Sequence, residues 1–193
     1  MAFLPPPTSA AWRHQGARTG FEVVYLHPVA RGHLLTGVTT AVEDGRPWVM
    51  DYEIRVDESW HTRSARVTGR FDTGSITRMV EADGEGLWRI DDEPAPHLDG
   101  CLDVDLESSA LTNALPIHRL DLEIGTTAHT PAAYVRVHDL EVERLEQQYS
   151  RTSDEDQRQR YDYTAPAFDF SSRLVYDAAG LVLVYPGIAV RAH

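Results

Sequence analysis

Apolar and polar residues alternate with a period of two along most of the chain. The pattern is clear in WVMDYEIRVD (48–57), HTRSARVTGRF (61–71) and RLVYD (173–177), which are rich in β-branched and aromatic residues. Alternation over segments of this length is typical of half-buried β-strands. We predict a mainly β protein with roughly ten to twelve strands, more than one flat sheet usually carries without curling or closing.

Turn sequences separate the predicted strands. Each of three such segments contains a glycine, Gly45, Gly84 or Gly180, which takes positive φ at little cost and so favours a tight hairpin turn. They lie at EDGRP (43–47), ADGEG (82–86) and DAAG (177–180). Because hairpins join neighbours in sequence, we expect the sheet to be mainly antiparallel.

One segment, SSALTNALP (108–116), departs from the strand pattern. It begins with serines that can cap a helix, its apolar residues recur at a spacing of four, and Pro116 predicts that the helix ends before it. We therefore expect one short helix, enclosed by the sheet. RLDLEIG (119–125) then predicts a strand, and a later strand is expected to run to Tyr149 and to be followed by a solvated loop over residues 154–159.

The length of 193 residues predicts one domain over residues 1–193, since a chain of this size buries roughly 70% of the surface that it exposes when unfolded. No apolar run approaches the roughly 18–20 residues of a membrane-spanning helix, and the N-terminus lacks the basic and apolar regions of a signal peptide. We expect no integral membrane segment and a cytoplasmic location. A single cysteine, Cys101, agrees with this location because it cannot form an internal disulfide.

The charged residues exclude several classes of function. The net charge of −12 argues against nucleic acid as a partner, because phosphate backbones need basic surfaces. All 18 basic residues are Arg, which excludes a Schiff-base lysine and a phosphate-binding P-loop lysine. The nine His residues have no spacing typical of zinc ligands, and the chain has no nucleophile elbow and no dinucleotide-binding motif. We predict no metal and no cofactor.

Several polar candidates lie in the otherwise apolar stretch from 99 to 122. Asp103 and Asp105 are two residues apart on a predicted strand, so their side chains point to the same side. If the predicted strand that carries Arg119 pairs with this one, the Arg119 guanidinium meets the two carboxylates on that side. In one interpretation they face an interior cavity, as a calcium site or an acid/base pair. In the other they are the solvent face of a half-buried strand, and Arg119 forms a salt-bridge network before any ligand contact. Asn113 is expected to hydrogen-bond a nearby loop backbone rather than a substrate.

Aromatic side chains form a second group of candidates. Most large aromatic residues are expected in the core, but such rings also line cavities and stack on sugars or lipids. Trp60 and Arg63 stand three apart at the start of a strand, and Tyr149 lies near the end of another. We include these three residues among the candidate ligand-binding residues.

Long segments of the chain resemble the bacterial family called putative glycolipid-binding proteins, formerly a domain of unknown function. The most specific are LDGCLDVDL (98–106), LTNALPIHRL (111–120), YDYTAPAF (161–168) and VYDAAGLVLVYPGI (175–188). The resemblance implies a spiral β-roll, in which a many-stranded antiparallel sheet wraps around a single α-helix, and it implies a homodimer. It also implies a likeness in shape to periplasmic lipoprotein carriers, the analogy from which the glycolipid label comes.

Three hypotheses about function follow. The first is a non-enzymatic protein that binds an amphipathic small molecule, such as a glycolipid or a lipid-like metabolite, with Trp60, Arg63, Asp103, Asn113 and Arg119 orienting its polar head. The second is a hydrolase or isomerase that acts on a sugar-like substrate through the Asp103, Asp105 and Arg119 cluster. The third is a structural dimer without a ligand.

Overall fold

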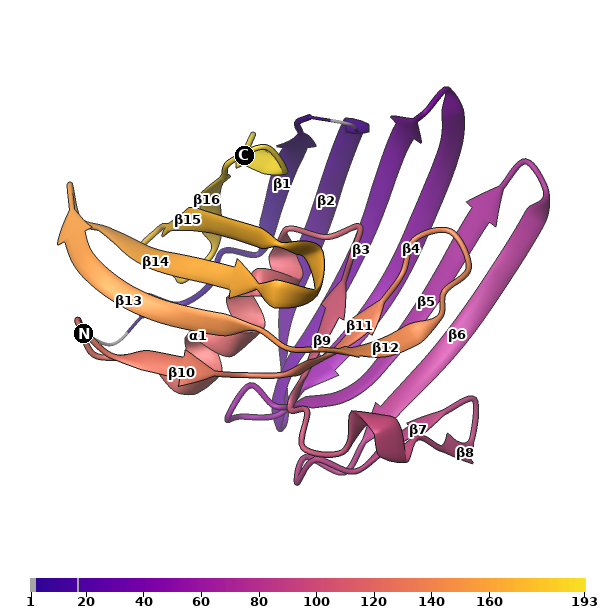
Figure 1. Cartoon of the computed structure of the whole chain (residues 1–193), viewed down its shortest axis with the longest axis horizontal. Coiled ribbons are helices and arrows are strands. Elements are labelled where there is room, and N and C mark those ends of the chain that lie inside the picture. The colour runs from indigo at the N-terminus through magenta and orange to yellow at the C-terminus, as the bar shows by residue number, and fades with distance from the viewer. Residues whose placement is uncertain (1–2, 17) are drawn as a thin grey trace.

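A single 14-stranded antiparallel sheet forms most of the molecule in the computed structural model, which describes residues 3–16 and 18–193 (Figure 1). In the order in which they pair, its strands are β10 (Thr127–His129), β13 (Gln148–Glu155), β14 (Arg158–Ala165), β15 (Phe170–Tyr176), β16 (Val182–Tyr185), β17 (Ala189–Arg191), β1 (Ser9–His14), β2 (Arg18–Val29), β3 (Gly32–Glu43), β4 (Arg46–Val56), β5 (Thr62–Phe71), β6 (Gly74–Ala82), β7 (Trp88–Ile90) and β8 (Glu93–Pro94). The prediction of a mainly β protein is confirmed.

The predicted hairpin turns form as the sequence indicates. Asp44 and Gly45, both with positive φ, join β3 to β4, and Gly180 turns the chain from β15 into β16. The solvated loop expected over 154–159 is wrong, because β13 and β14 run on to a tight turn at Asp156 and Gln157. Both of these residues have positive φ, which a two-residue hairpin turn requires.

A second, three-stranded sheet lies inside the curve of the large one. It consists of β12 (Val142–Leu145), β11 (Ala132–Val135) and β9 (Asp103–Leu106), and β9 pairs with β11 in parallel. All four residues of β9 are buried. The interpretation of Asp103 and Asp105 as a solvent face is therefore wrong, because an enclosed strand has no solvent face and its alternation separates two buried sides.

The chain crosses the interior as the 3₁₀ turn η2 (Leu111–Asn113), which continues into the helix α1 (Ala114–Leu120). Pro116 does not end the helix but lies in its first turn, where a missing backbone N–H costs little. The helix ends instead at Asp121, which takes a left-handed conformation with φ of 39°. Arg119 is thus on the helix and not on the predicted strand. Two further 3₁₀ turns are η1 (Pro96–Leu98) and η3 (Pro166–Phe168).

The helix segment joins two parts of the core. Leu111 and Leu115 belong to a cluster with side chains of β1 to β5, whereas Ile117 belongs to a tyrosine-rich cluster on β13 to β16. Figure 1 shows α1 between the long strands β1–β6 and the shorter strands β13–β15. The expected single helix wrapped by a curled antiparallel sheet is confirmed. Within the described ranges, no helix is long and apolar enough to cross a bilayer.

Candidate functional site

The candidate site is a pocket of about 340 Å³ between the inner strands β9 and β11 and the C-terminal strands β14–β16. This volume is at the lower end of the roughly 300–1,000 Å³ range of ligand pockets. One side is apolar and mostly aromatic, and the other carries charged and amide groups. The lining side chains include Tyr134, Leu145, Tyr163, Phe168, Phe170, Tyr185 and Ile188 on the first side, and Gln15, Arg18, Glu43, Asp105, Glu107, Ser109 and Asn113 on the second.

Five rings form the aromatic wall of the pocket. Those of Tyr163, Phe170 and Tyr185 contact one another with centroids 6.0–6.2 Å apart and planes inclined by 60–77°. Tyr134 and Phe168 form a second pair at 5.5 Å. Phe168 is 51% exposed, so this wall reaches the mouth of the pocket. Rings inclined in this way present both faces and edges to a ligand.

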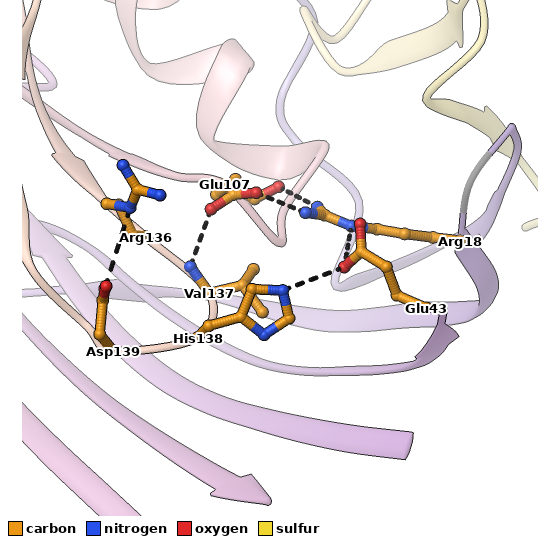
Figure 2. Close-up of polar contacts among 7 residues, drawn as sticks. All are labelled: Arg18, Glu43, Glu107, Arg136, Val137, His138 and Asp139. Atoms are coloured by element: carbon orange, nitrogen blue, oxygen red, sulfur yellow. Dashed lines mark hydrogen bonds and ion pairs between the residues drawn. The ribbon is translucent and has the colours of Figure 1, made fainter. Parts of the chain in front are cut away.

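An arginine held between two carboxylates forms the polar lip (Figure 2). Arg18 donates from Nε to Glu43 at 3.0 Å, and its two terminal nitrogens donate to the backbone oxygen and to Oε1 of Glu107 at 2.7 and 2.5 Å. The other carboxylate oxygen of Glu107 accepts from the backbone N–H of Val137 at 2.8 Å. His138 approaches Glu43 at 3.7 Å. In this network each of the three guanidinium nitrogens of Arg18 donates to an oxygen of Glu43 or Glu107.

Asp105 is the buried acid of the pocket. It accepts hydrogen bonds from the Thr112 hydroxyl at 2.8 Å and from the Gln147 amide at 2.5 Å. Burial raises the pKa of this carboxyl from 3.8 to about 6, although both hydrogen bonds act to lower it. No ion pair of the described residues includes Asp105, so its charge at neutral pH is balanced only by neutral donors.

Asn113 lies beside Asp105 in the pocket lining. Its side-chain oxygen accepts a hydrogen bond from the Tyr149 hydroxyl at 3.0 Å, and its backbone oxygen accepts one from Tyr176 at 3.2 Å. The expected bond from Asn113 to a nearby loop backbone is therefore wrong, since the partner strands β13 and β15 are distant in sequence. Tyr149 does not line the pocket but fixes the orientation of Asn113.

The predicted meeting of Asp103 with Arg119 occurs, but away from the pocket. Arg119 donates from Nε and Nη2 to the two oxygens of Asp103 at 3.0 and 2.5 Å, and Thr130 donates to the same carboxylate. The side chains are only 10% and 3% exposed. Neither residue is part of the pocket lining. This bidentate pair ties α1 to β9.

Trp60 and Arg63 also lie outside the pocket. The Trp60 ring stacks between His33 and His118, with centroid distances of 4.7 and 3.8 Å. Burial lowers the pKa of His118 to about 4, so this histidine stacks as a neutral ring at physiological pH. Arg63 is largely exposed and approaches Asp57 only to 3.9 Å. The structure therefore brings together Asp105 and Asn113 of the predicted residues, with Tyr149 behind them.

Glu22 is a buried acid that the sequence analysis missed. It accepts hydrogen bonds from the Tyr52 hydroxyl at 2.5 Å, from the Ser109 hydroxyl and from the backbone N–H of Ala110 at 2.7 Å. Its side chain is completely buried, and burial raises its pKa. Through these bonds Glu22, on β2, holds in place the segment Ser109–Ala110 that leads into η2. The alternation of β2 gives no signal for this buried acid, because the exposed face carries apolar residues such as Val23 just as the buried face carries Val24.

The described residues contain neither an activated thiol nor a metal-binding cluster. Burial raises the pKa of the Cys101 thiol to about 11, which keeps it protonated. Across the described part of the chain, no three His, Cys, Asp or Glu side chains are grouped so that they could hold a metal ion.

Comparisons with known proteins agree with this architecture. A family model described as "Putative glycolipid-binding" matches residues 9–191. A crystal structure of a DUF1089 family protein from Pseudomonas aeruginosa is similar over 95% of this chain and 91% of that chain, with a TM-score of 0.73 and 31% sequence identity. A search of curated proteins found no match.

Proposed function

Because this chain belongs to the putative glycolipid-binding family, we propose that it is a binding protein that holds one amphipathic small molecule in the pocket between β9, β11 and β14–β16. The molecule would be a glycolipid or a similar lipid-like metabolite. Its apolar part would lie on the aromatic wall, and its polar head would face the acidic and amide groups of the opposite side.

The two-sided lining of the pocket is the observation that supports this proposal. An apolar ligand would bring no counter-charge to the buried Asp105 carboxylate, and a wholly polar ligand would make poor use of five aromatic rings. An amphipathic molecule satisfies both sides. In this proposal Asp105 and Asn113 contact the head and Tyr149 positions Asn113, whereas Asp103 and Arg119 maintain the scaffold.

The pocket mouth offers a test with little cost to folding. Phe168 and Ile188 line the pocket but are 51% and 38% exposed, so replacing both with alanine removes ligand contacts and little core. Losing apolar contacts of this size is expected to weaken binding of a fluorescent alkyl glycoside probe roughly 10-fold or more. Fluorescence titration of protein stripped of lipid measures the effect.

Ile124→Ala is the matched control, since Ile124 is 58% exposed on a turn and is not part of the pocket lining. It should bind the probe like the wild type. Equal affinities of the wild type and the Phe168→Ala, Ile188→Ala double variant would show that the probe binds elsewhere. Failure of the wild type to bind any amphiphile would end the proposal.

The hydrolase or isomerase hypothesis has weaker support. Of its three residues only Asp105 lines the pocket, whereas Asp103 and Arg119 satisfy each other in the interior. A raised pKa suits an acid/base group. Acid/base catalysis also needs a second polar group on the other side of the substrate, and neither Asp103 nor Arg119 is in the pocket to supply it.

We also propose that the protein is a homodimer in the cytoplasm. Phe21, Val23 and Tyr25 of β2 and Val38 of β3 share the outer face of the sheet and are 38–52% exposed, a contiguous apolar patch that a second copy could cover. Light scattering is expected to give twice the chain mass of 21.6 kDa. A molar mass of one chain at micromolar concentration would contradict the dimer.

A further inference from the structure

We propose that the polar head of the ligand carries an organic cation, an ammonium or quaternary ammonium group, held between the Asp105 carboxylate and the aromatic wall. This inference rests on the proposed function and names the chemical class of its ligand. It follows from the charge balance of the pocket, from the state of Arg18 and from the arrangement of the rings.

Among the described residues of the lining, the one guanidinium, that of Arg18, is already paired with two carboxylates. One Arg18 nitrogen donates to Glu43 and the other two donate to Glu107, so each nitrogen already has an oxygen partner. A phosphate, sulfate or carboxylate head would have to displace these carboxylates and would then lie beside them. Three carboxylates against one guanidinium make the pocket unfavourable for anions.

Asp105 is the carboxylate of the pocket that lacks a cation. Glu43 and Glu107 share Arg18, and the nearby Asp103 is neutralised by Arg119. Asp105 receives only the hydroxyl of Thr112 and the amide of Gln147. Buried charges in proteins are normally paired, so this carboxylate is a site at which a ligand cation gains a partner.

The aromatic wall is suited to the same chemistry. Cations are attracted to the faces of aromatic rings, and inclined rings that share a corner are the usual way in which proteins bind ammonium groups. The rings of Tyr163, Phe170 and Tyr185 have this arrangement, at 6.0–6.2 Å and 60–77°. Asp105 raises the pKa of Tyr163 and of Tyr185 electrostatically, after the larger effect of burial, which indicates that its charge reaches these rings.

The cation could belong to an amino sugar or to a quaternary ammonium headgroup, and one experiment distinguishes them. Four amphiphiles with the same decyl chain are titrated calorimetrically into the full chain: decyl glucoside, decyl glucosaminide, decyltrimethylammonium and decyl sulfate. We expect at least one cationic compound to bind roughly 10-fold or more tightly than the glucoside, and the sulfate to bind weakest. The tighter of the two cations identifies the source.

Asp105→Asn tests the residue itself. It should lower the affinity for the cationic compound roughly 10- to 100-fold and the affinity for the glucoside by a much smaller factor, because it removes a charge but keeps the volume and hydrogen-bonding capacity of the side chain. Asp72→Asn makes the same change on the exposed turn between β5 and β6 and should leave both affinities unchanged. Glucoside or sulfate binding as tight as cation binding, or an unaffected Asp105→Asn variant, would overturn the cation inference alone. Binding of none of the four would overturn the proposed function as well.

The stability of Asp105→Asn shows whether the variant is folded. The folded-state pKa of Asp105 is raised from 3.8 to about 6, so the stability that it contributes is complete below 3.8 and is lost as the pH rises through about 6. Asparagine avoids this loss, and Gln147 can turn its amide to accept from it. The variant is therefore expected to melt at pH 8 no lower than the wild type, and a lower melting temperature would contradict this account of Asp105.

The affinity for the cation should also depend on pH. Binding by the wild type is expected to weaken as the pH falls through about 6, because Asp105 becomes protonated, and Asp105→Asn should lack this step. A step that persists in the variant would assign it to another group and contradict the inference. The charged and titratable groups around Asp105 are Asp103, Glu107, Arg18, Glu43, Tyr134, Tyr149, Tyr163, Tyr176 and Tyr185.

Discussion

Replacing Arg119 with alanine is expected to lower the free energy of unfolding by about 3–5 kcal/mol, because it leaves the Asp103 carboxylate buried without its partner. For a chain of this size the melting temperature should fall by roughly 10 °C or more. Thr130 retains its bond to Asp103 and reduces the loss only in part. Amphiphile affinity of the folded protein should be unchanged, since Arg119 is outside the pocket lining. Chemical denaturation and calorimetric binding measure the two effects.

The chain contains a matched control for this substitution. Arg173 and Asp162 form a pair of the same bidentate geometry on β15 and β14, but their side chains are 57% and 47% exposed. Arg173→Ala should cost at most about 1 kcal/mol, as exposed ion pairs do. If Arg119→Ala left stability unchanged and abolished binding, Arg119 would be a ligand clamp and the structural assignment would be wrong.

Replacing Glu22 with alanine should destabilise the protein by about 3–5 kcal/mol, because three donors lose a shared, fully buried acceptor. The donors belong to Tyr52, Ser109 and Ala110, so the change loosens the segment that leads from β9 into η2. Since Ser109 and Asn113 line the pocket, ligand affinity should fall together with stability. Thermal unfolding and probe titration of the same samples give both values.

Glu22→Gln separates the charge from the hydrogen bonds. A glutamine oxygen can accept from the Ala110 N–H while its amide donates to the two hydroxyl oxygens. Burial opposes the charged form of Glu22 and raises its pKa, so the glutamine variant, which keeps the hydrogen bonds, should lie within about 1 kcal/mol of the wild type. A glutamine variant as unstable as the alanine variant would show that the ionised carboxylate itself holds the segment.

The hairpins could be predicted from the sequence because their signals are local. A glycine or an Asp-Gly pair between alternating segments determines a turn within a few residues, as at Asp44 and Gly45. The helix was found for the same reason, although Pro116 was assigned to its end. Proline is excluded from helix interiors but is accepted in the first turn. Pro116 is in the first turn because α1 begins only at Ala114, after the η2 turn, and the sequence alone does not show this boundary.

The environment of Asp103 and Asp105 could not be predicted because it depends on a non-local pairing. β9 pairs in parallel with β11, about 30 residues later, and the large sheet then encloses both faces of β9. The alternation of the strand is the same whether its polar side faces water or an interior network. The sequence pattern therefore identified the acids and the pairing of Asp103 with Arg119, but not the Thr112 and Gln147 partners of Asp105.

The sequence does not show which face of β2 is buried, because both faces carry apolar residues. Phe21, Val23 and Tyr25 face outward and are exposed, whereas Val24 shares the buried face with Glu22. In such a segment a buried acid is not distinguishable from a surface acid. The same limit applies to Arg18, Glu43 and Glu107, which lie far apart in sequence and meet only when the sheet curls.

The glycolipid label of the family and the cation inference are compatible. A sugar that carries an amine is both a glycolipid head and an organic cation, and it can stack on aromatic rings while its ammonium group faces Asp105. A neutral sugar uses the rings but leaves Asp105 without a counter-charge. The pocket therefore favours a narrower class of ligand than the family label names.

The crystal structure of the complex with the tightest-binding decyl amphiphile tests the central claim most directly. We predict ligand density in the pocket, with the headgroup between Asp105 and the rings of Tyr163 and Tyr185 and the decyl chain against Phe168 and Ile188 at the mouth. An empty pocket with the amphiphile bound to the exposed outer face of β2 and β3 would contradict it.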